Sequence, residues 1–261
     1  MRSTLSAEAI AADLRRPIRV EVQREVGSTN TEAKTRLARE ESPPFLLLAE
    51  SQTAGRGRLG RSFCSPDGAG LYMSLALPAN LPAEELLSVT AAAAVAVCQA
   101  IESLTPLRPQ IKWVNDVYWN DKKLCGILTE GVIDPVSGRW TALVVGIGVN
   151  CKAAPLPPEV AAIATSLEQA GVTIDRNRLA AAICDRLWEL YSDLPQKTWL
   201  APYRARSWLD QKTVTCKIGD RTVEGVALGI DDSGALLLGT AEGVQRLFSG
   251  EATVRPAFKV N

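Results

Sequence analysis

A glycine-rich loop between two predicted strands constrains the fold of this chain more than any other feature. The loop reads GRGRLG, from Gly55 to Gly60, and follows an apolar run, FLLLAE, that predicts a buried strand. A dinucleotide-binding turn of this pattern would continue into a helix that holds a pyrophosphate at its N-terminus. Here the next residues, RSFCSPDGAG, contain a proline and two glycines and lead into GLYMSLALP, which alternates like another strand. The loop therefore joins strand to strand, and a Rossmann fold is not expected.

The residue types that are missing exclude several other classes of protein. The chain has 261 residues and no histidine, which excludes the H-R-D motif of protein kinases and histidine-based catalytic triads. No G-x-x-x-x-G-K-[ST] run occurs, so a P-loop is excluded as well. The six cysteines show no C-x-x-C spacing, which argues against a zinc site. Any chemistry must therefore use lysine, arginine, carboxylate or backbone groups.

The charges balance, with 29 lysines and arginines against 29 aspartates and glutamates. A balanced chain is not expected to bind nucleic acid or an anionic membrane in bulk. The N-terminus lacks the apolar core of a signal peptide, and the longest apolar run, VTAAAAVAVCQAI, is too short to span a bilayer. We therefore expect a cytoplasmic protein with no nucleic-acid or membrane partner.

The character of the sequence changes about four fifths of the way along the chain. Before that point, the patterns predict helices over residues 6–15, 29–40, 82–103, 175–194 and 198–209. Thr29 and Glu32 fit a capping box at the start of the second of these helices. From Thr213 onward, five short strands follow one another with glycine and aspartate turns, as in a small β-barrel. We therefore expect two domains, residues 1–210 and residues 211–261.

The three arginines of the loop, Arg56, Arg58 and Arg61, suggest an anion clamp. Glycine lets the backbone approach a ligand closely, and arginine offers a forked, permanently charged donor for phosphate or carboxylate. A solvated surface loop or an RNA-binding patch would show the same residues. The loop alone leaves these three interpretations open.

Four other short motifs accompany the loop. In KWVND, Lys112 suits a phosphate, and Asn115 and Asp116 offer oxygens for magnesium or for a proton. In KKLCGILTE, Gly126 lets a ligand approach the strand closely, next to Lys123. GSTN places small hydrogen-bonding groups at a helix start, and GIGVN offers bare backbone on which a flat ring could rest. Each motif alone also fits a purely structural role.

Taken together and in this order, STN, QTAGRGRLGR, KWVND, KLCGILTE and GIGVN resemble the biotin–protein ligase family. The resemblance covers Val26 to Asn150 and extends more loosely through LAPYRARSWLD and SGEATVR. It implies an α+β fold, in which a catalytic domain related to class II aminoacyl-tRNA synthetases precedes a small SH3-like β-barrel. It also implies that biotin and ATP react, with Mg²⁺, to give biotinyl-5′-AMP. Biotin then passes to a lysine of the biotin carboxyl carrier protein of acetyl-CoA carboxylase. Family members are monomers or homodimers, so a homodimer is possible.

The resemblance also implies roles for individual residues. Three would act in catalysis: Lys123, Arg58 and Asp116, the last as a Mg²⁺ ligand or as the group that orients the acceptor lysine. Biotin would contact Ser28, Thr29, Asn30, Gln52, Gly55, Arg56, Gly57, Arg58, Lys123, Gly146 and Gly148. ATP would contact Arg58, Arg61, Phe63, Lys112, Asn115, Asn150 and Arg255.

The sequence departs from the family pattern in three places. Phe63 stands where the family usually has tryptophan, so adenine would stack on a smaller ring. Val114 replaces the proline of K-W-P-N-D, which loosens that turn without removing a functional group. Only about 20 residues precede the first predicted strand, too few for a helix-turn-helix. We therefore expect a monofunctional ligase and not a transcriptional repressor.

Three rival functions remain at this stage. A lipoate or octanoate ligase or transferase shares the fold, but a linear acyl chain does not need the ureido-binding groups of S-T-N and Q-x-x-G-R-G-R. A nucleic-acid-binding module would use the arginine loop and the barrel, although the net charge is zero. A catalytically inactive biotin-binding regulator would not need both Lys112 and Lys123.

Overall fold

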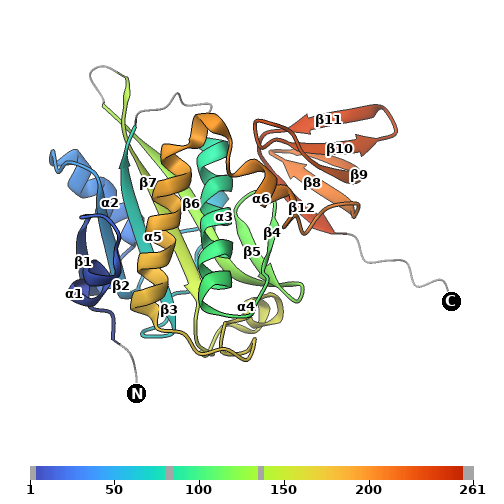
Figure 1. The fold of residues 1–261 in the computed structure, drawn as a ribbon. Helices are drawn as coiled ribbons and strands as arrows, with labels where there is room; N and C mark the ends of the chain where they lie inside the picture. Colours follow the sequence, from blue (N-terminus) through green and yellow to red (C-terminus); the bar gives the residue numbers. More distant parts are fainter. Residues whose placement is uncertain (1–3, 80–84, 135–137, 255–261) are drawn as a thin grey trace.

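The computed structural model describes residues 4–79, 85–134 and 138–254. The larger part is a seven-stranded sheet with the strand order β1-β2-β3-β7-β6-β5-β4 (Figure 1). β1 and β2 pair in parallel, and the other pairs of this sheet are antiparallel. The strands are β1 (Arg19–Val26), β2 (Phe45–Gln52), β3 (Gly70–Pro78), β4 (Gln110–Lys112), β5 (Asp116–Trp119), β6 (Lys122–Ile133) and β7 (Trp140–Asn150).

Helices cover both faces of this sheet. They and the short 3₁₀ turns are α1 (Ala7–Asp13), α2 (Thr29–Ala38), η1 (Arg58–Gly60), α3 (Leu86–Leu104), α4 (Pro158–Ile163), α5 (Arg176–Ser192), η3 (Leu194–Gln196) and α6 (Leu200–Arg204). Phe45 packs with Ala76, Val144 and α2 on one face, whereas its neighbour Leu46 joins the larger cluster around α3 and α5. This alternation from one residue to the next makes the central strands apolar on both sides.

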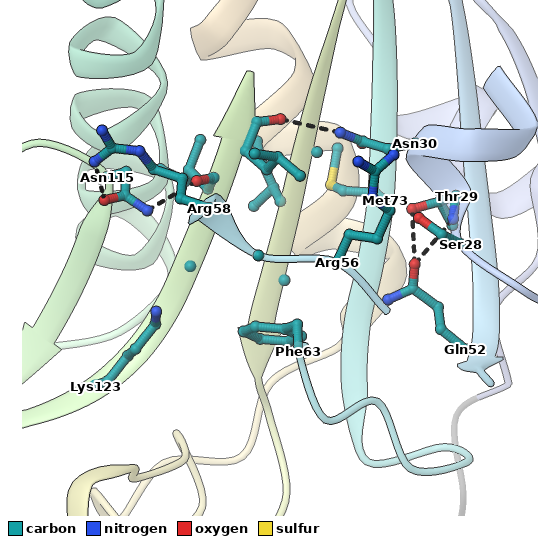
Figure 2. Close-up of a pocket in the computed structure, with 17 residues that line it drawn as sticks. Ser28, Thr29, Asn30, Gln52, Arg56, Arg58, Phe63, Met73, Asn115 and Lys123 are labelled. Carbon is teal, nitrogen blue, oxygen red and sulfur yellow. Dashed lines mark hydrogen bonds between the residues drawn. The ribbon is translucent and has the colours of Figure 1, made fainter. Parts of the chain in front are cut away.

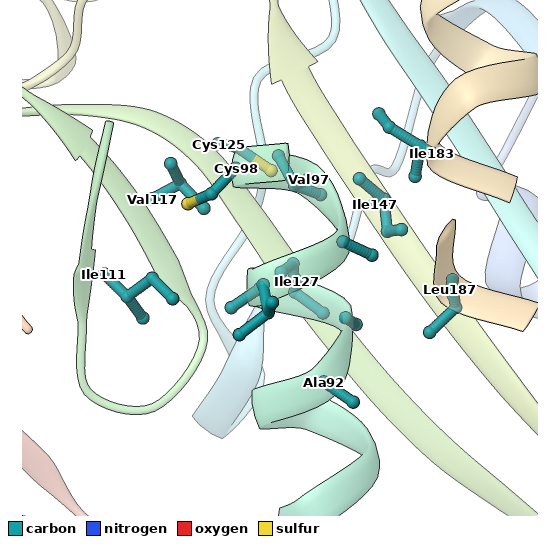
Figure 3. Close-up of a cluster of buried hydrophobic side chains, with 14 of the residues drawn as sticks. Ala92, Val97, Cys98, Ile111, Val117, Cys125, Ile127, Ile147, Ile183 and Leu187 are labelled. Carbon is teal, nitrogen blue, oxygen red and sulfur yellow. The ribbon is translucent and has the colours of Figure 1, made fainter. Parts of the chain in front are cut away.

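α3 is the central helix of the core and lies beside α5 (Figure 1). Its residues Leu87–Leu104 are apolar and numerous enough to cross a membrane, but 72% of that window is buried inside the protein. Figure 3 shows Ala92 and Val97 of α3 in the same cluster as Ile147 of β7 and Leu187 of α5. The apolar character of α3 therefore serves packing within the fold.

A second sheet lies after α6 and has five antiparallel strands in the order β11-β10-β9-β8-β12. Its strands are β8 (Thr213–Ile218), β9 (Arg221–Ile230), β10 (Leu236–Thr240), β11 (Gly243–Leu247) and β12 (Glu251–Val254). The α+β class and the five short C-terminal strands are thus confirmed. The indole of Trp113 donates to the Gly234 carbonyl at 2.9 Å and so joins the two sheets. The domain boundary between residues 210 and 211 stays a prediction.

One predicted helix is wrong in extent. The pattern predicts a helix over residues 198–209, but α6 ends at Arg204. Beyond it the chain pairs with β4: the Ile111 amide donates to the Arg206 carbonyl at 2.7 Å, and the Trp208 amide donates to the Ile111 carbonyl at 2.8 Å. These strand-like bonds occupy the backbone groups that a longer helix would need. The predicted start of α3 at Pro82 lies outside the described residues.

Candidate functional site

A narrow hollow opens between the start of α2, the glycine loop and the β6–β7 pair (Figure 2). Within the described part of the chain, every residue predicted to contact biotin lines this hollow except Gly55. We call it the polar hollow. Four apolar members of its lining carry no chemical signature in the sequence and escape prediction: Met73, Ile127, Leu128 and Ile147. Only the alternation of their strands could have indicated that some of them face the site.

Ser28 caps α2, and this leaves Thr29 facing the hollow. Ser28 has an extended backbone, and its hydroxyl accepts from the Thr31 amide at 3.5 Å. The predicted capping box, with Thr29 as the cap, is therefore wrong by one residue. The amide and the hydroxyl of Thr29 instead donate to Oε1 of Gln52, at 2.9 and 3.1 Å. Gln52 donates from Nε2 to the Ser65 hydroxyl at 2.7 Å, which fixes the direction of its amide group.

The floor of the polar hollow is bare backbone. A Cβ atom added at Gly146 would lie 2.1 Å from Oδ1 of Asn30, and one added at Gly148 would lie 2.5 Å from the Phe63 ring. A Cβ atom at Gly126, on the adjoining strand, would come within 3.1 Å of the same ring. The side chains of Asn30 and Phe63 thus occupy the space that Cβ atoms at these three positions would need. This is the physical reason for glycine at each of them.

The glycine loop closes on itself as a small hairpin. The Phe63 amide donates to the Gly55 carbonyl at 2.8 Å, and the Gly57 amide donates to the Arg61 carbonyl at 2.7 Å. A Cβ atom at Gly55 would lie only 2.3 Å from the carbonyl oxygen of Phe63, so the hairpin requires glycine there. Gly55 supports the loop through its backbone, and its contact with biotin stays a prediction.

A second hollow adjoins the first and collects four cationic side chains: Arg58, Arg61, Lys112 and Lys123. We call it the cationic hollow. The residues that line both hollows are Gly57, Arg58, Phe63, Asn115 and Lys123. The two hollows are therefore neighbours, and Arg58 and Lys123 belong to both linings. Figure 2 shows these two side chains with Asn115 on one side of the polar hollow.

Two carboxylates in the cationic hollow hold two of these cations. Nζ of Lys123 lies 2.7 Å from Oδ1 of Asp116. Arg61 of the loop forms a two-pronged ion pair with Glu251 of β12, which links the glycine loop to the second sheet. The hydrogen bond from Arg61 lowers the pKa of Glu251. An anionic ligand that enters this hollow would compete with these two carboxylates for Lys123 and Arg61.

Arg58 and Lys112 are partly buried cations of this hollow. Burial lowers the pKa of both side chains, and the negative charge of Asp116 works against that shift. Arg58 donates to Oδ1 of Asn115 at 3.1 Å. Lys112 donates to the Tyr118 hydroxyl at 3.2 Å, and its Nζ lies 5.2 Å from the centre of that ring. Partly desolvated cations interact more strongly with an anionic ligand than cations in bulk water do.

Two further residues are predicted to bind ATP. Arg255 lies outside the described residues, and Asn150 lines a third hollow together with Cys64. Nδ2 of Asn150 donates to the Thr165 carbonyl at 2.9 Å and to the Lys123 carbonyl at 3.4 Å. The third hollow therefore adjoins the backbone of Lys123, and Asn150 has a structural role there whatever its contact with a ligand.

Among the described residues, no group of three or more cysteine, aspartate or glutamate side chains could hold a metal ion. Asp116, the predicted Mg²⁺ ligand, pairs with Lys123 and has the Asn115 amide as its chain neighbour. Magnesium that enters with a nucleotide needs only one or two protein carboxylates, because phosphates and water supply the other oxygens. The residues present fit such a metal and do not form a dedicated cage.

Comparison with known proteins gives a consistent result. Residues 22–150 match the model of the Biotin/lipoate A/B protein ligase family, and residues 212–255 match that of the Biotin protein ligase C terminal domain. The chain is 36% identical over 240 residues to the Bifunctional ligase/repressor BirA of Bacillus subtilis, covering 88% of this chain and 72% of the relative. It is 35% identical over 230 residues to the Biotin--[acetyl-CoA-carboxylase] ligase of Mycobacterium tuberculosis, covering 84% of this chain and 82% of the relative.

Solved structures agree with the sequence relatives. The biotin protein ligase from Aquifex aeolicus, in complex with biotin and ATP, superposes with a TM-score of 0.77 and 29% sequence identity. The superposition covers 91% of this chain and 99% of the other. The fold and the site thus define a ligase of the biotin/lipoate A/B protein ligase family, and this chain belongs to that family. Within the family, the similar proteins from Mycobacterium tuberculosis and Aquifex aeolicus are biotin ligases by name.

Proposed function

We propose that this chain is an ATP-dependent biotin–protein ligase. The carboxylate of biotin attacks the α-phosphorus of ATP, an acyl–phosphate bond forms, and pyrophosphate leaves, which gives biotinyl-5′-AMP. A lysine amine of a biotin carboxyl carrier protein then attacks the acyl carbon, and AMP leaves. The observation that carries this proposal is the meeting of a polar hollow and a cationic hollow at Arg58 and Lys123.

The polar hollow suits the head of biotin. Thr29, Asn30 and Gln52 offer hydrogen-bonding groups that match the carbonyl and the two N–H groups of a ureido ring. Gly146 and Gly148 let the side chains of Asn30 and Phe63 lie close against β7, and the bicycle would rest beside them on this floor. A lipoate or octanoate ligase is the second candidate of the same fold, but a linear acid has no ureido group to match these side chains.

The cationic hollow suits the triphosphate of ATP. Arg58, Arg61 and Lys112 would supply positive charge for the phosphates. Lys123 lines both hollows, and the carboxylate of biotin would meet the α-phosphorus beside it. A carboxylate is ionised at neutral pH and needs no general base, which agrees with a chain that lacks histidine. Catalysis then depends on alignment and on charge stabilisation of the developing pentacoordinate phosphorus.

The remaining parts of the nucleotide have candidate neighbours as well. The adenine base would lie against Phe63 and extend toward Asn150 of the third hollow, whose side chain donates to the Lys123 carbonyl at 3.4 Å. Magnesium would neutralise phosphate charge, and Asp116 and Asn115, which line the cationic hollow, would be the residues that hold it. The acceptor would be a biotin carboxyl carrier protein in the cytoplasm, and the chain could act as a homodimer.

The experiment that tests this function is exchange of labelled pyrophosphate into ATP, measured with magnesium and with one acid at a time. Biotin should support exchange, whereas lipoate and octanoate should not. Transfer to a purified biotin carboxyl carrier domain should follow when ATP and biotin are supplied together. Exchange with the linear acids in place of biotin would show that the chain belongs to the lipoate branch of its family.

A further inference from the structure

Glu130 of β6 collects partners from two separate segments beside the polar hollow. Lys34 of α2 donates from Nζ to Oε1 of Glu130 at 2.6 Å, and Asn30 donates from Nδ2 to Oε2 at 2.9 Å. Arg56 of the glycine loop pairs with Oε1 at 3.4 Å. Burial acts to raise the pKa of Glu130, but the hydrogen bonds from Lys34 and Asn30 outweigh it and the pKa is lowered. The carboxylate is therefore ionised at neutral pH.

The neighbours of Asn30 determine which way its amide points. Nδ2 faces the Leu128 carbonyl at 3.1 Å and the Glu130 carboxylate, and both of these groups can only accept. The nitrogen must therefore lie on that side. Oδ1 then faces the other way, where it accepts from the Ser74 hydroxyl at 2.7 Å and lies over the bare backbone of Gly146. An amide oxygen has two lone pairs, so one is left for an N–H group in the hollow.

Arg56 differs from the other two arginines of the loop in what it contacts. Arg58 and Arg61 line the cationic hollow, whereas the guanidinium of Arg56 pairs with Glu130. Arg56 thus ties the start of the glycine loop to β6. One carboxylate, Glu130, therefore fixes both a wall of the polar hollow, through Asn30, and the loop that covers the hollow.

We propose that Glu130 is a positioning residue for biotin, acting through Asn30 and Arg56 without being in the lining itself. The ionised carboxylate keeps the Asn30 amide turned so that its oxygen meets an N–H group of the ureido ring. This inference rests on the proposed function, because a linear acid has no such N–H group. With an amide in place of the carboxylate, the side chain at 130 can donate as well as accept. The Asn30 nitrogen then keeps only the Leu128 carbonyl as a partner that must accept, so its amide is held less firmly toward the N–H group of the ligand.

The test compares the unsubstituted chain with Glu130→Gln. The Kd for biotin, measured by titration calorimetry, should rise about tenfold, since one hydrogen bond to the ligand is lost. The KM for ATP in pyrophosphate exchange should stay the same, because within the described residues Glu130 is not in the lining of the cationic hollow. If Glu130 only stabilised the fold, its loss would not weaken biotin binding selectively. A change in biotin affinity without a change in ATP affinity therefore indicates positioning.

Glu102→Gln is a matched control. The Glu102 side chain is 16% exposed and pairs with Arg206 at 2.6 Å, and the Glu130 side chain is 18% exposed and pairs with Lys34 at 2.6 Å. Glu102→Gln should lose comparable stability and bind biotin normally. Glu130→Asp adds a second test, because shortening the side chain by about 1.5 Å keeps the charge but withdraws it from Asn30. Its Kd should lie between those of the unsubstituted chain and Glu130→Gln.

Each outcome bears on a different claim. An unchanged Kd in Glu130→Gln, or equal losses in Glu130→Gln and Glu102→Gln, would overturn the inference and leave the proposed function intact. If Glu130→Gln does not fold, Glu130→Asp decides, and a normal Kd in that variant would contradict the inference. No biotin binding by the unsubstituted chain would remove the proposed function and the inference with it.

Discussion

Adding one methyl group to the floor of the polar hollow, by Gly146→Ala, should damage both folding and biotin binding. The new Cβ atom would lie 2.1 Å from Oδ1 of Asn30, well inside the van der Waals distance. Asn30 cannot swing aside at low cost, because Leu128, Glu130 and Ser74 hold its amide. Overpacking of this kind costs about 1–3 kcal/mol. For a chain of this size, each kcal/mol lowers Tm by about 2–4 °C.

The effect on ligand binding should exceed the effect on stability. A displaced Asn30 enters the space that the ureido ring would occupy and loses its orientation, so the Kd for biotin should rise at least about tenfold. Gly27→Ala is the control, because a Cβ atom there meets nothing within 4 Å. Thermal scans and calorimetric titration of both variants make the comparison. If Gly146→Ala binds biotin as tightly as Gly27→Ala does, the ligand does not rest on this part of β7.

Three further outcomes are expected from other parts of the molecule. Phe63→Ala should raise the KM for ATP about tenfold in pyrophosphate exchange, since stacking of a base on an aromatic ring contributes about 1–3 kcal/mol; an unchanged KM would place adenine elsewhere. Arg176→Leu should lower the free energy of urea unfolding by about 3–5 kcal/mol, because it leaves the Glu50 carboxylate buried without its ion-pair partner at 2.8 Å. Replacing both residues with leucine should restore much of that loss. The hydrogen bond from Arg36 lowers the pKa of Glu21 from 4.5 to about 2. This pair should therefore stabilise the fold above pH 4.5, and that stability should be lost as the pH falls toward 2. An NMR titration that finds an ordinary pKa for Glu21 would contradict this.

The strand-to-strand setting of the glycine loop is predictable because local patterns specify it. FLLLAE and GLYMSLALP form β2 and β3, and they pair with each other in the central sheet. The five C-terminal strands are predictable for the same reason, since each is bounded by its own turn residues. Hydrophobic alternation and turn residues act over a few positions, so they can be recognised in the sequence without knowledge of the tertiary structure.

The features that escape prediction depend on distant partners. The predicted helix over residues 198–209 is cut short because residues after Arg204 pair with Ile111 of β4. Thr29 appears in the sequence as a helix cap, but Ser28 takes that position and Thr29 turns to Gln52. The role of Glu130 depends on Asn30 and Arg56, which lie 100 and 74 residues before it in the chain. No local motif marks such a role.

The most direct test of the central claim is biotin-dependent pyrophosphate exchange in Lys123→Ala and Arg58→Ala, the two residues at which the hollows meet. Lys122→Ala is the control, because Lys122 neighbours Lys123 in β6 but is exposed. The account predicts that exchange is nearly abolished in Lys123→Ala and Arg58→Ala and is normal in Lys122→Ala. Normal exchange in Lys123→Ala would contradict it, because the carboxylate and the α-phosphorus could then not meet at the junction of the two hollows.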